Sequence, residues 1–240
     1  MSSAIALIPA RANSKRFPRK NLAMLGDKPL LAWTIEAALE SGVFDEVVLS
    51  SDSDEILQTV SGYQDAGLTY ELRSPHLATD DATAVQVLSD VIARRAADGK
   101  NYQACSLLLP TCPFRDAQDI QRAFALLTDE VKSVVSMKQT AQLPQFMFRQ
   151  SEDGLAKVPE QFCSTDFAAT RLQANPEYFY PNGAIYFAHT DAFLSEQRFY
   201  TDNMKIYSMP EARSIDIDNQ VDLVFAQAVL ENNIHQEDFA

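Results

Sequence analysis

Short, continuous apolar runs alternate along the chain with longer segments in which apolar residues recur every three or four positions. The short runs are typical of buried strands, and the periodic segments are typical of amphipathic helices. Strands are therefore predicted at residues 4–8, 46–50, 68–72, 104–109 and 133–137. The repeated order of strand and helix predicts an α/β fold, a three-layer arrangement in which helices cover both faces of a mostly parallel, mixed sheet.

Several helices carry recognisable start and stop signals. Asp27 and Pro29 predict a helix start, with a capping carboxylate and a proline in the first turn, and Ser41-Gly42 predicts its end. Further helices are expected from about residue 54 to 65, around 85–92, from 116 to 127 and around 223–230.

The regular alternation fails between residues 138 and 180, where prolines and aromatic residues are scattered among polar ones. Such an aromatic-rich segment is more often an interface than a self-contained fold. With 240 residues and 46% hydrophobic content, the chain is long enough for one sizeable core. We therefore expect a single domain over residues 1–240, with 138–180 as an excursion from it.

Composition excludes several classes of protein. No apolar run approaches the roughly 18 residues of a membrane span, and no signal peptide is visible at the N-terminus. Three cysteines form no ligand-spaced set, and an odd number argues against a disulfide framework, so a reduced, cytoplasmic protein is expected. The net charge of −13 disfavours nucleic-acid binding, which needs a broad basic surface.

One stretch of this acidic chain is basic. Residues 11–20 contain five of the 20 Lys and Arg, and no acid precedes Asp27. The stretch follows the strand at 4–8, so it leaves the carboxyl end of that strand, where open α/β sheets bind ligands. Asn13 and Ser14 can turn onto neighbouring backbone groups and leave amide N–H groups free for an anion. This context favours a polyphosphate site over a solvated basic turn, although no Walker A or dinucleotide-binding motif occurs.

A second candidate feature is the Asp-Ile-Asp sequence near the C-terminus. In an extended segment alternate residues share a face, so Asp216 and Asp218 project together. Two neighbouring carboxylates suit Mg²⁺ held between the protein and phosphates. Capping of the following helix by Asp218 is the alternative interpretation.

The basic loop resembles the signature loop of the acylneuraminate cytidylyltransferases, also called CMP-sialic acid synthetases. The resemblance is carried by Pro-Ala-Arg at 9–11, Ser-Lys-Arg at 14–16, Pro-Arg-Lys-Asn at 18–21, Pro-Thr-Cys-Pro-Phe-Arg at 110–115 and Asn-Gly-Ala-Ile-Tyr at 182–186, and it runs from about residue 5 to 230. That family joins CMP to nonulosonic (sialic-type) sugars. The resemblance implies the nucleotide-diphosphosugar transferase fold, CTP as substrate, Mg²⁺ as cofactor, and a homodimer in which 138–180 forms a dimerisation arm at the sugar site.

The resemblance also assigns residues. It implies that CTP is bound by Arg11, Ala12, Asn13, Ser14, Lys15, Arg16, Lys20, Asn21, Arg73, Asp80 and Thr83. It implies that the sugar is bound by Leu109, Thr111, Arg171, Asn182, Gly183, Tyr186, Phe199 and Tyr200. Asp216 and Asp218 would be the metal ligands. The catalytic set would be Lys20 at the α-phosphate, Arg11 at the leaving pyrophosphate, and Asp218 or a water on the metal as base.

Some of these assignments have simpler alternatives. The segment 73–83 also reads as an ordinary loop and helix cap, and Phe199-Tyr200 also suits a hydrophobic loop anchor. Ala12 and Asn13 stand where the family has glycine, Cys112 replaces a small polar residue, and Leu109 replaces a glutamine that the family directs toward the sugar. Cys112 is not expected to act as a nucleophile, because direct phosphoryl transfer needs none.

The implied reaction is in-line attack by the anomeric hydroxyl of the sugar on the α-phosphorus of CTP, with pyrophosphate leaving. The alternatives are cytidylyl transfer to 3-deoxy-manno-octulosonate, another nucleotidyl transfer, or a non-catalytic nucleotide-binding regulator. Because Leu109 can neither donate nor accept a hydrogen bond, we expect a sugar with an apolar substituent at this point, as in legionaminic acid.

Overall fold

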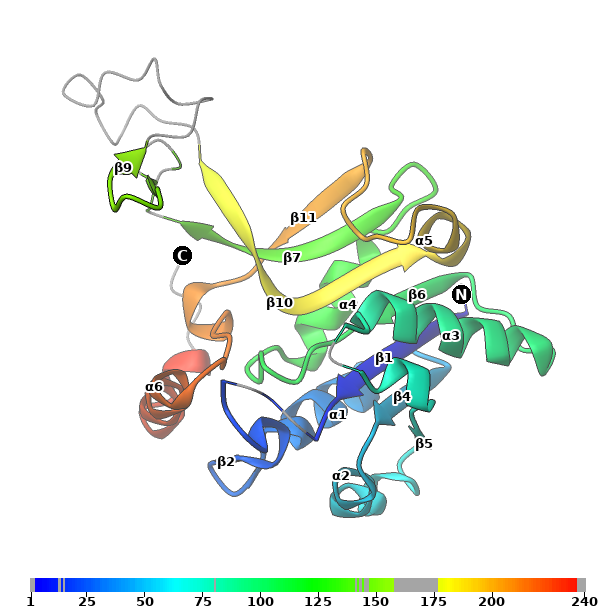
Figure 1. Cartoon of the computed structure of the whole chain (residues 1–240). Helices are drawn as coiled ribbons and strands as arrows, with labels where there is room; N and C mark the ends of the chain where they lie inside the picture. The colour runs from blue at the N-terminus through cyan, green and yellow to red at the C-terminus, as the bar shows by residue number, and fades with distance from the viewer. Residues whose placement is uncertain are drawn as a thin grey trace.

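The computed structural model describes residues 3–12, 14, 16–79, 81–140, 142, 144, 147–157 and 177–236. Its centre is a seven-stranded sheet in the order β11-β7-β10-β6-β1-β4-β5. The strands are β1 (Ala4–Ala10), β4 (Glu46–Ser51), β5 (Leu68–Leu72), β6 (Ala104–Leu107), β7 (Ser133–Thr140), β10 (Tyr178–His189) and β11 (Met204–Ser208). All neighbours are parallel except β10, which runs antiparallel to β6 and β7 (Figure 1). The five predicted strands are confirmed.

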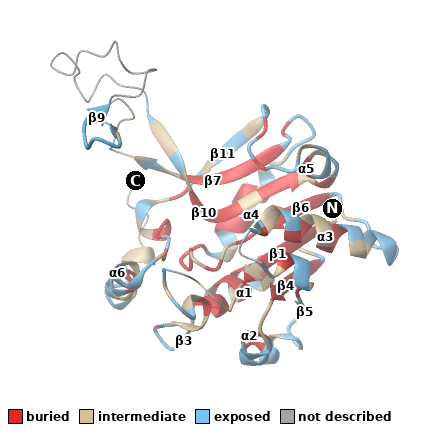
Figure 2. Ribbon diagram, in the orientation of Figure 1, coloured by how far each residue is buried: buried red, intermediate tan, exposed pale blue. Residues whose placement is uncertain are grey.

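Helices cover both faces of this sheet, as predicted. Side chains of α1 (Leu30–Glu40), α2 (Asp54–Thr59) and α4 (Ala117–Ala125) share one buried cluster with Ala6 and Ile8 of β1. Side chains of α3 (Ala84–Ala97) and α5 (Thr190–Glu196) share the other with Ile5 and Leu7. The continuous apolar run of β1 is thus buried on both faces, as a central parallel strand requires (Figure 2).

A third apolar cluster holds the C-terminal helix against the body. It joins α6 (Gln220–Glu231) to Leu25, Leu30, Phe114, Ile215 and Ile217. Because Ile215 and Ile217 are buried here, the alternate residues of that extended segment face outward. The cluster therefore fixes which way the Asp-Ile-Asp sequence presents its carboxylates.

The predicted helix start at Asp27 is wrong. Residues 24–29 form a small hairpin of β2 (Met24–Leu25) and β3 (Lys28–Pro29), whose two-residue turn contains Gly26 at φ +67°. Gly26 and Asp27 are a common pair of turn residues, and the turn outweighs the cap signal. Helix α1 begins only at Leu30, without a side-chain cap, and its end beside Ser41-Gly42 is confirmed.

Other boundaries shift by a few residues. The helix expected to reach residue 65 ends at Thr59, and the one-turn helix η2 (Ser61–Tyr63) follows it. Helix α4 spans 117–125 within the predicted 116–127, because Asp116 is its N-cap. Strand β6 ends at Leu107 and leaves the predicted residues 108 and 109 in the following turn.

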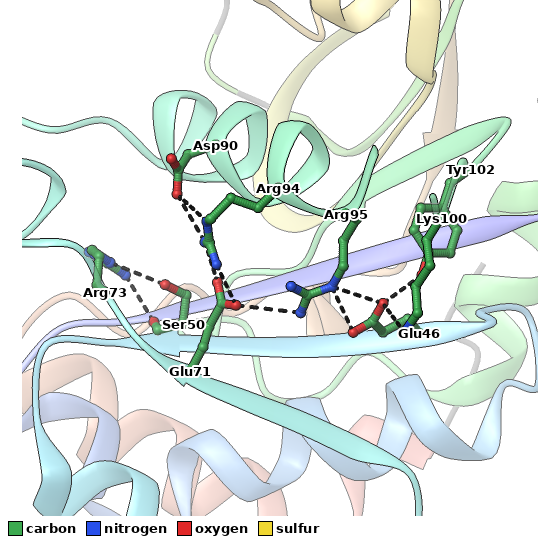
Figure 3. A network of polar contacts seen from close by, with 9 residues as sticks. All are labelled: Glu46, Ser50, Glu71, Arg73, Asp90, Arg94, Arg95, Lys100 and Tyr102. Atoms are coloured by element: carbon green, nitrogen blue, oxygen red, sulfur yellow. Dashed lines mark hydrogen bonds and ion pairs between the residues drawn. The ribbon is translucent and has the colours of Figure 1, made fainter. Parts of the chain in front are cut away.

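Helix α3 is tied to the sheet by an ion network (Figure 3). Arg94 pairs with Glu71 of β5, and Arg95 pairs with both Glu71 and Glu46 of β4. Burial raises the pKa of the Glu46 carboxyl, but hydrogen bonds from Tyr102 and Arg95 and nearby positive charge outweigh burial, so its pKa is lowered overall. The network therefore ties α3 to the first residue of β4 and to the next-to-last residue of β5.

The excursion beyond Lys138 is partly described. The ends of β7 and β10 continue as a two-stranded ribbon away from the body, and β8 (Arg149–Gln150) pairs with β9 (Ala156–Lys157) (Figure 1). Met147, Phe148 and Leu155 of this part are largely exposed. Residues 158–176 lie outside the described residues. Within the described part of the chain, none of the helices has the length and apolar character to cross a membrane.

Candidate active site

A cavity of about 390 Å³ opens at the carboxyl edge of the sheet, between the loop after β1, the end of β5 and the turn after β6. Its described lining residues are Pro9, Arg11, Ser14, Arg16, Lys20, Asn21, Arg73, Ala84, Leu109, Pro110 and Thr111. Four of them are cationic and none is acidic. The cavity thus brings together segments that are far apart in the sequence, from Pro9 to Thr111, around one positively charged hollow.

Lys20 and Asp218 meet although 198 residues separate them, with Lys20 Nζ donating to Asp218 Oδ1 at 3.0 Å. The one-turn helix η1 (Lys20–Leu22) places Lys20, whose side chain is largely buried. Arg16 pairs with the second oxygen of Asp218 at 2.9 Å. The predicted proximity of basic loop and Asp-Ile-Asp segment is therefore seen in the structure.

Asp216 lies on the same side of its segment as Asp218. The pKa of its carboxyl is raised, chiefly because the surrounding protein desolvates it and also because Asp218 and Asp222 are negative; a hydrogen bond from Thr111 and the charge of Lys20 oppose the shift. Raised acid pKa values are typical of sites where carboxylates are brought together for binding a cation.

Helix capping does not explain Asp218. Asn219 is the N-cap of α6, and its side chain accepts from the amides of Val221 and Asp222. The side chain of Asp222 accepts in turn from the amides of Asp218 and Asn219. The alternative interpretation of Asp218 as the cap is wrong, and its carboxylate is left to Lys20 and Arg16.

The loop after β1 is held by three contacts. Arg11 donates to the carbonyl of Ala82, and Asn21 Nδ2 donates to the carbonyl of Arg11 at 2.9 Å. The amide of Ala12 donates to Asp52 Oδ1 at 2.7 Å. The amide of Ala12 is therefore not among the N–H groups that this loop could leave free for an anion. Sequence analysis missed Asp52; its signal is an acid directly after the strand beside β1.

Arg73 is buried beneath the cavity. Its Nη2 donates to the carbonyl of Ser50 at 2.9 Å and its Nε to Ser50 Oγ at 3.4 Å (Figure 3). Burial lowers the pKa of Arg73, and the nearby charge of Arg11 lowers it further. Two guanidinium groups that repel each other at one cavity favour the binding of an anion between them.

Thr83 has a structural task of its own. Its side chain is exposed and forms a capping box with Gln86 at the start of α3. The ordinary cap interpretation thus accounts for Thr83, and its assignment to the CTP site stays a prediction.

Close to Leu109, Asn182 and Gly183 lie at the register irregularity within β10. Asn182 is buried, and its amide group forms hydrogen bonds with Ser136, Ser214 and the amide of Ala184, so these protein groups engage it. Gly183 has φ +80°, and a Cβ there would lie 3.5 Å from Leu109 Cδ1 and 3.9 Å from Asp216 Oδ2. Leu109 and Asp216 therefore lie close together over this glycine.

The predicted aromatic residues form one cluster. The Tyr186 ring lies 5.4 Å from that of Phe199 and 6.3 Å from that of Tyr200. Burial raises the pKa of Tyr186, and Tyr200 raises it further, so the hydroxyl stays protonated. Phe199 is buried, as the anchor interpretation expects, whereas Tyr200 is half exposed and free to contact a ligand.

Four assigned residues, Asn13, Lys15, Asp80 and Arg171, lie outside the described residues. Cys112 is fully buried, and burial raises the pKa of its thiol to about 12, which agrees with its expected lack of a nucleophilic role.

Comparison with known proteins places this geometry in a family. A family model described as cytidylyltransferase matches residues 5–238. The CMP-N,N'-diacetyllegionaminic acid synthase of Legionella pneumophila is 34% identical over 95% of this chain and 97% of its own length. The N-acylneuraminate cytidylyltransferase of Streptococcus agalactiae is 33% identical over 92% of this chain, which spans about half, 51%, of that relative's length.

A solved structure described as CMP:2-keto-3-deoxy-manno-octonic acid synthetase complexed with CTP shares the fold. Its TM-score is 0.69, with 16% identity over 97% of this chain and 100% of the other. The expected α/β fold of the nucleotide-diphosphosugar transferase kind is confirmed by this likeness. Together with the match over almost the whole sequence, it shows that the chain belongs to the cytidylyltransferase family.

Proposed function

We propose that the protein transfers CMP from CTP to the anomeric hydroxyl of a nonulosonic acid and releases pyrophosphate. The observation that carries the proposal is the cavity with four cationic and no acidic lining residues, beside Asp216 and Asp218 at the carboxyl edge of the sheet. A nucleoside triphosphate supplies the negative charge that this cavity lacks. The same reaction is supported by the names of two relatives, an N-acylneuraminate cytidylyltransferase and a CMP-N,N'-diacetyllegionaminic acid synthase.

In this proposal the basic side chains bind and orient the triphosphate. Lys20, on the rigid η1 turn and largely buried, is placed to meet the α-phosphate, where charge develops in the transition state. Arg11 and Arg16 take the β- and γ-phosphates, and Arg73 completes the positive wall. Catalysis then consists mostly of positioning and charge neutralisation.

Asp216 and Asp218 suit Mg²⁺. Among the described residues, no group of three or more His, Cys, Asp or Glu side chains could hold a metal ion. A pair of carboxylates fits Mg²⁺ nevertheless, because this ion is commonly held by one or two carboxylates together with substrate phosphates and water. When bound there, Mg²⁺ would neutralise charge on the phosphates. Asp218, whose oxygens already accept from Lys20 and Arg16, would hold those cations beside the phosphates, and the proposed base is Asp218 or a water on the metal.

The acceptor sugar is proposed to lie over Leu109, Thr111 and Gly183, with Tyr186 and Tyr200 at its side. Leu109 offers an apolar wall next to Asp216. A sugar with a methyl group at this point, of the legionaminic type, suits that wall better than one with a hydroxyl group.

A homodimer and a cytoplasmic setting also belong to the proposal. The arm and the projecting ribbon expose large apolar side chains of the kind that protein interfaces bury, namely Met147, Phe148, Leu155 and Tyr180. Cys105 and Cys112 are free, buried thiols, which suits a reducing compartment.

The test is pyrophosphate release from CTP and Mg²⁺ with a panel of acceptors: sialic, legionaminic, pseudaminic and 3-deoxy-manno-octulosonic acids. We expect release only with an acceptor, and fastest with a nonulosonic acid. Fastest turnover with the eight-carbon acid would favour the alternative transferase, and CTP binding without release for any acceptor would favour a nucleotide-binding regulator.

A further inference from the structure

The carboxyl ends of β1, β4 and β5 are joined by polar contacts that all pass through β4. Ala10 and Ser51 are register partners in the parallel pair of β1 and β4, so both strands end side by side. Just beyond, the amide of Ala12 donates to Asp52 Oδ1 at 2.7 Å. On the other flank, the amide of Arg73 donates to the carbonyl of Ser51 at 2.6 Å. The end of β4 thus holds the two segments that carry cationic groups into the cavity.

Asp52 is the unexpected member of this arrangement, because it is an acid beside a hollow that collects positive charge. A carboxylate near a polyphosphate site opposes anion binding through Coulomb repulsion. This repulsion is outweighed only if the contacts that Asp52 makes strengthen anion binding by more than its charge weakens it. Here it holds the first amide of the basic loop, and its charge also counters the effects of burial and of Arg11 on Arg73.

Ser50 supplies the second half of the arrangement. Its carbonyl and hydroxyl oxygens both accept from the guanidinium of Arg73, which fixes the plane of that group (Figure 3). Arg73 lines the cavity, whereas Asp52 lies outside the described lining residues. Any effect of Asp52 on the cavity is therefore expected to act through the residues that it contacts, of which Ala12 is one.

We propose that Asp52 is a positioning residue for nucleotide binding: it anchors the backbone at Ala12 so that Arg11 is held in the cavity. The inference rests on the proposed binding of CTP in this cavity. Without the anchor, the loop must be ordered when the nucleotide binds, and binding is weakened by the cost of that ordering.

The experiment compares Asp52→Ala, Asp52→Asn and the control Asp54→Asn. Asparagine can still accept from the Ala12 amide through Oδ1, whereas alanine cannot. Asp54, exposed at the start of α2, allows the same loss of charge two residues away. Four quantities are measured for each protein: the Kd for CTP without acceptor by titration calorimetry, the KM for CTP, the KM for the sugar acid, and Tm.

Asp52→Ala should raise the Kd and KM for CTP about tenfold, with the KM for the sugar acid unchanged and Tm within a few degrees of wild type. Asp52→Asn should recover to within about threefold, and Asp54→Asn should match wild type. An unchanged CTP Kd in Asp52→Ala, or an equal loss in Asp54→Asn, would overturn the positioning role. If the wild-type protein itself does not bind CTP, the proposed function is wrong. That result differs from the two outcomes that would overturn only the positioning role of Asp52.

Discussion

The ion network between α3 and the sheet pairs three carboxylates with three cationic side chains, whereas the cavity at the carboxyl edge is lined by four cationic side chains and no carboxylate. The network members are Glu46, Glu71, Asp90, Arg94, Arg95 and Lys100 (Figure 3). In the network every charge has an opposite charge within contact distance. At the cavity a single carboxylate, Asp218, pairs with both Lys20 and Arg16, and the lining residues contribute Arg11 and Arg73 as further positive charges.

This difference distinguishes charged groups that stabilise the fold from charged groups that bind a ligand. A balanced, partly buried network is complete without a ligand, so its loss should cost stability. The excess positive charge of the cavity is neutralised only when an anion binds, so removing these charged side chains should weaken binding and turnover. A second cavity, about 500 Å³ and larger, makes the same point, because its lining mixes Lys28, Arg115 and Arg122 with Glu36, Glu40 and Asp116. Size alone would favour this second cavity over the one that we propose binds CTP.

The largest effect is expected at the two carboxylates beside the cavity. Asp216→Asn and Asp218→Asn should each abolish Mg²⁺-dependent turnover, because a hard cation binds a neutral amide far less well than a carboxylate. CTP binding should survive in both variants. The assay is pyrophosphate release over a range of Mg²⁺ concentrations, and a wild-type Mg²⁺ dependence in either variant would remove that residue from the metal site.

Lys20→Ala should lower kcat by about a hundredfold or more with the fold intact, because it removes a charge placed to meet the transition state. Arg11→Ala should mainly raise the Kd for CTP. Lys28→Ala is the control, since Lys28 is also a partly buried, ion-paired lysine but lines the other cavity. Full turnover by Lys20→Ala would show that the basic loop does not take part in catalysis.

Leu109→Gln should change which sugar is preferred. A polar sugar substituent buried against leucine loses water without gaining a partner, at a cost of about 1–3 kcal/mol, or roughly tenfold to a hundredfold in selectivity. Wild type should have the higher kcat/KM with legionaminic acid, and the substitution should shift the ratio toward sialic acid. A wild-type preference for sialic acid, or a ratio that the substitution leaves unchanged, would show that position 109 does not set specificity.

Glu46→Gln should have the smallest effect on turnover, less than about twofold, but should lower the free energy of unfolding by about 2 kcal/mol at pH 7. The folded-state pKa of Glu46 lies below its ordinary value of 4.5, so this stability is present above that pH and is lost as the pH falls through the folded-state pKa. Urea unfolding at pH 7 and pH 3.5 measures it. A difference between wild type and variant that does not shrink at pH 3.5 would contradict the network's role.

Local patterns predicted much of the fold. The apolar run of β1, the starts of the five predicted strands and the alternation of Ile215, Asp216 and Ile217 depend on neighbouring residues, so they are visible in sequence. At Asp27 two local signals competed, and the two-residue turn prevailed because it lets Met24 and Leu25 pair with β3.

The site was less predictable, because its contacts join distant residues. The approach of Lys20 to Asp218 spans 198 positions and followed only from the family resemblance, and the bond between Ala12 and Asp52 spans 40 positions and was missed. Both depend on strand order and register, which periodicity does not encode. The roles of the assigned residues in binding CTP and sugar stay predictions.

The most direct test of the central claim is the location of the nucleotide. A crystal structure with a non-hydrolysable CTP analogue and Mg²⁺ should place the triphosphate in the 390 Å³ cavity, with phosphate oxygens in contact with Arg11 and Lys20 and the metal beside Asp216 and Asp218. A nucleotide bound instead in the 500 Å³ cavity beside Trp33 would contradict the account.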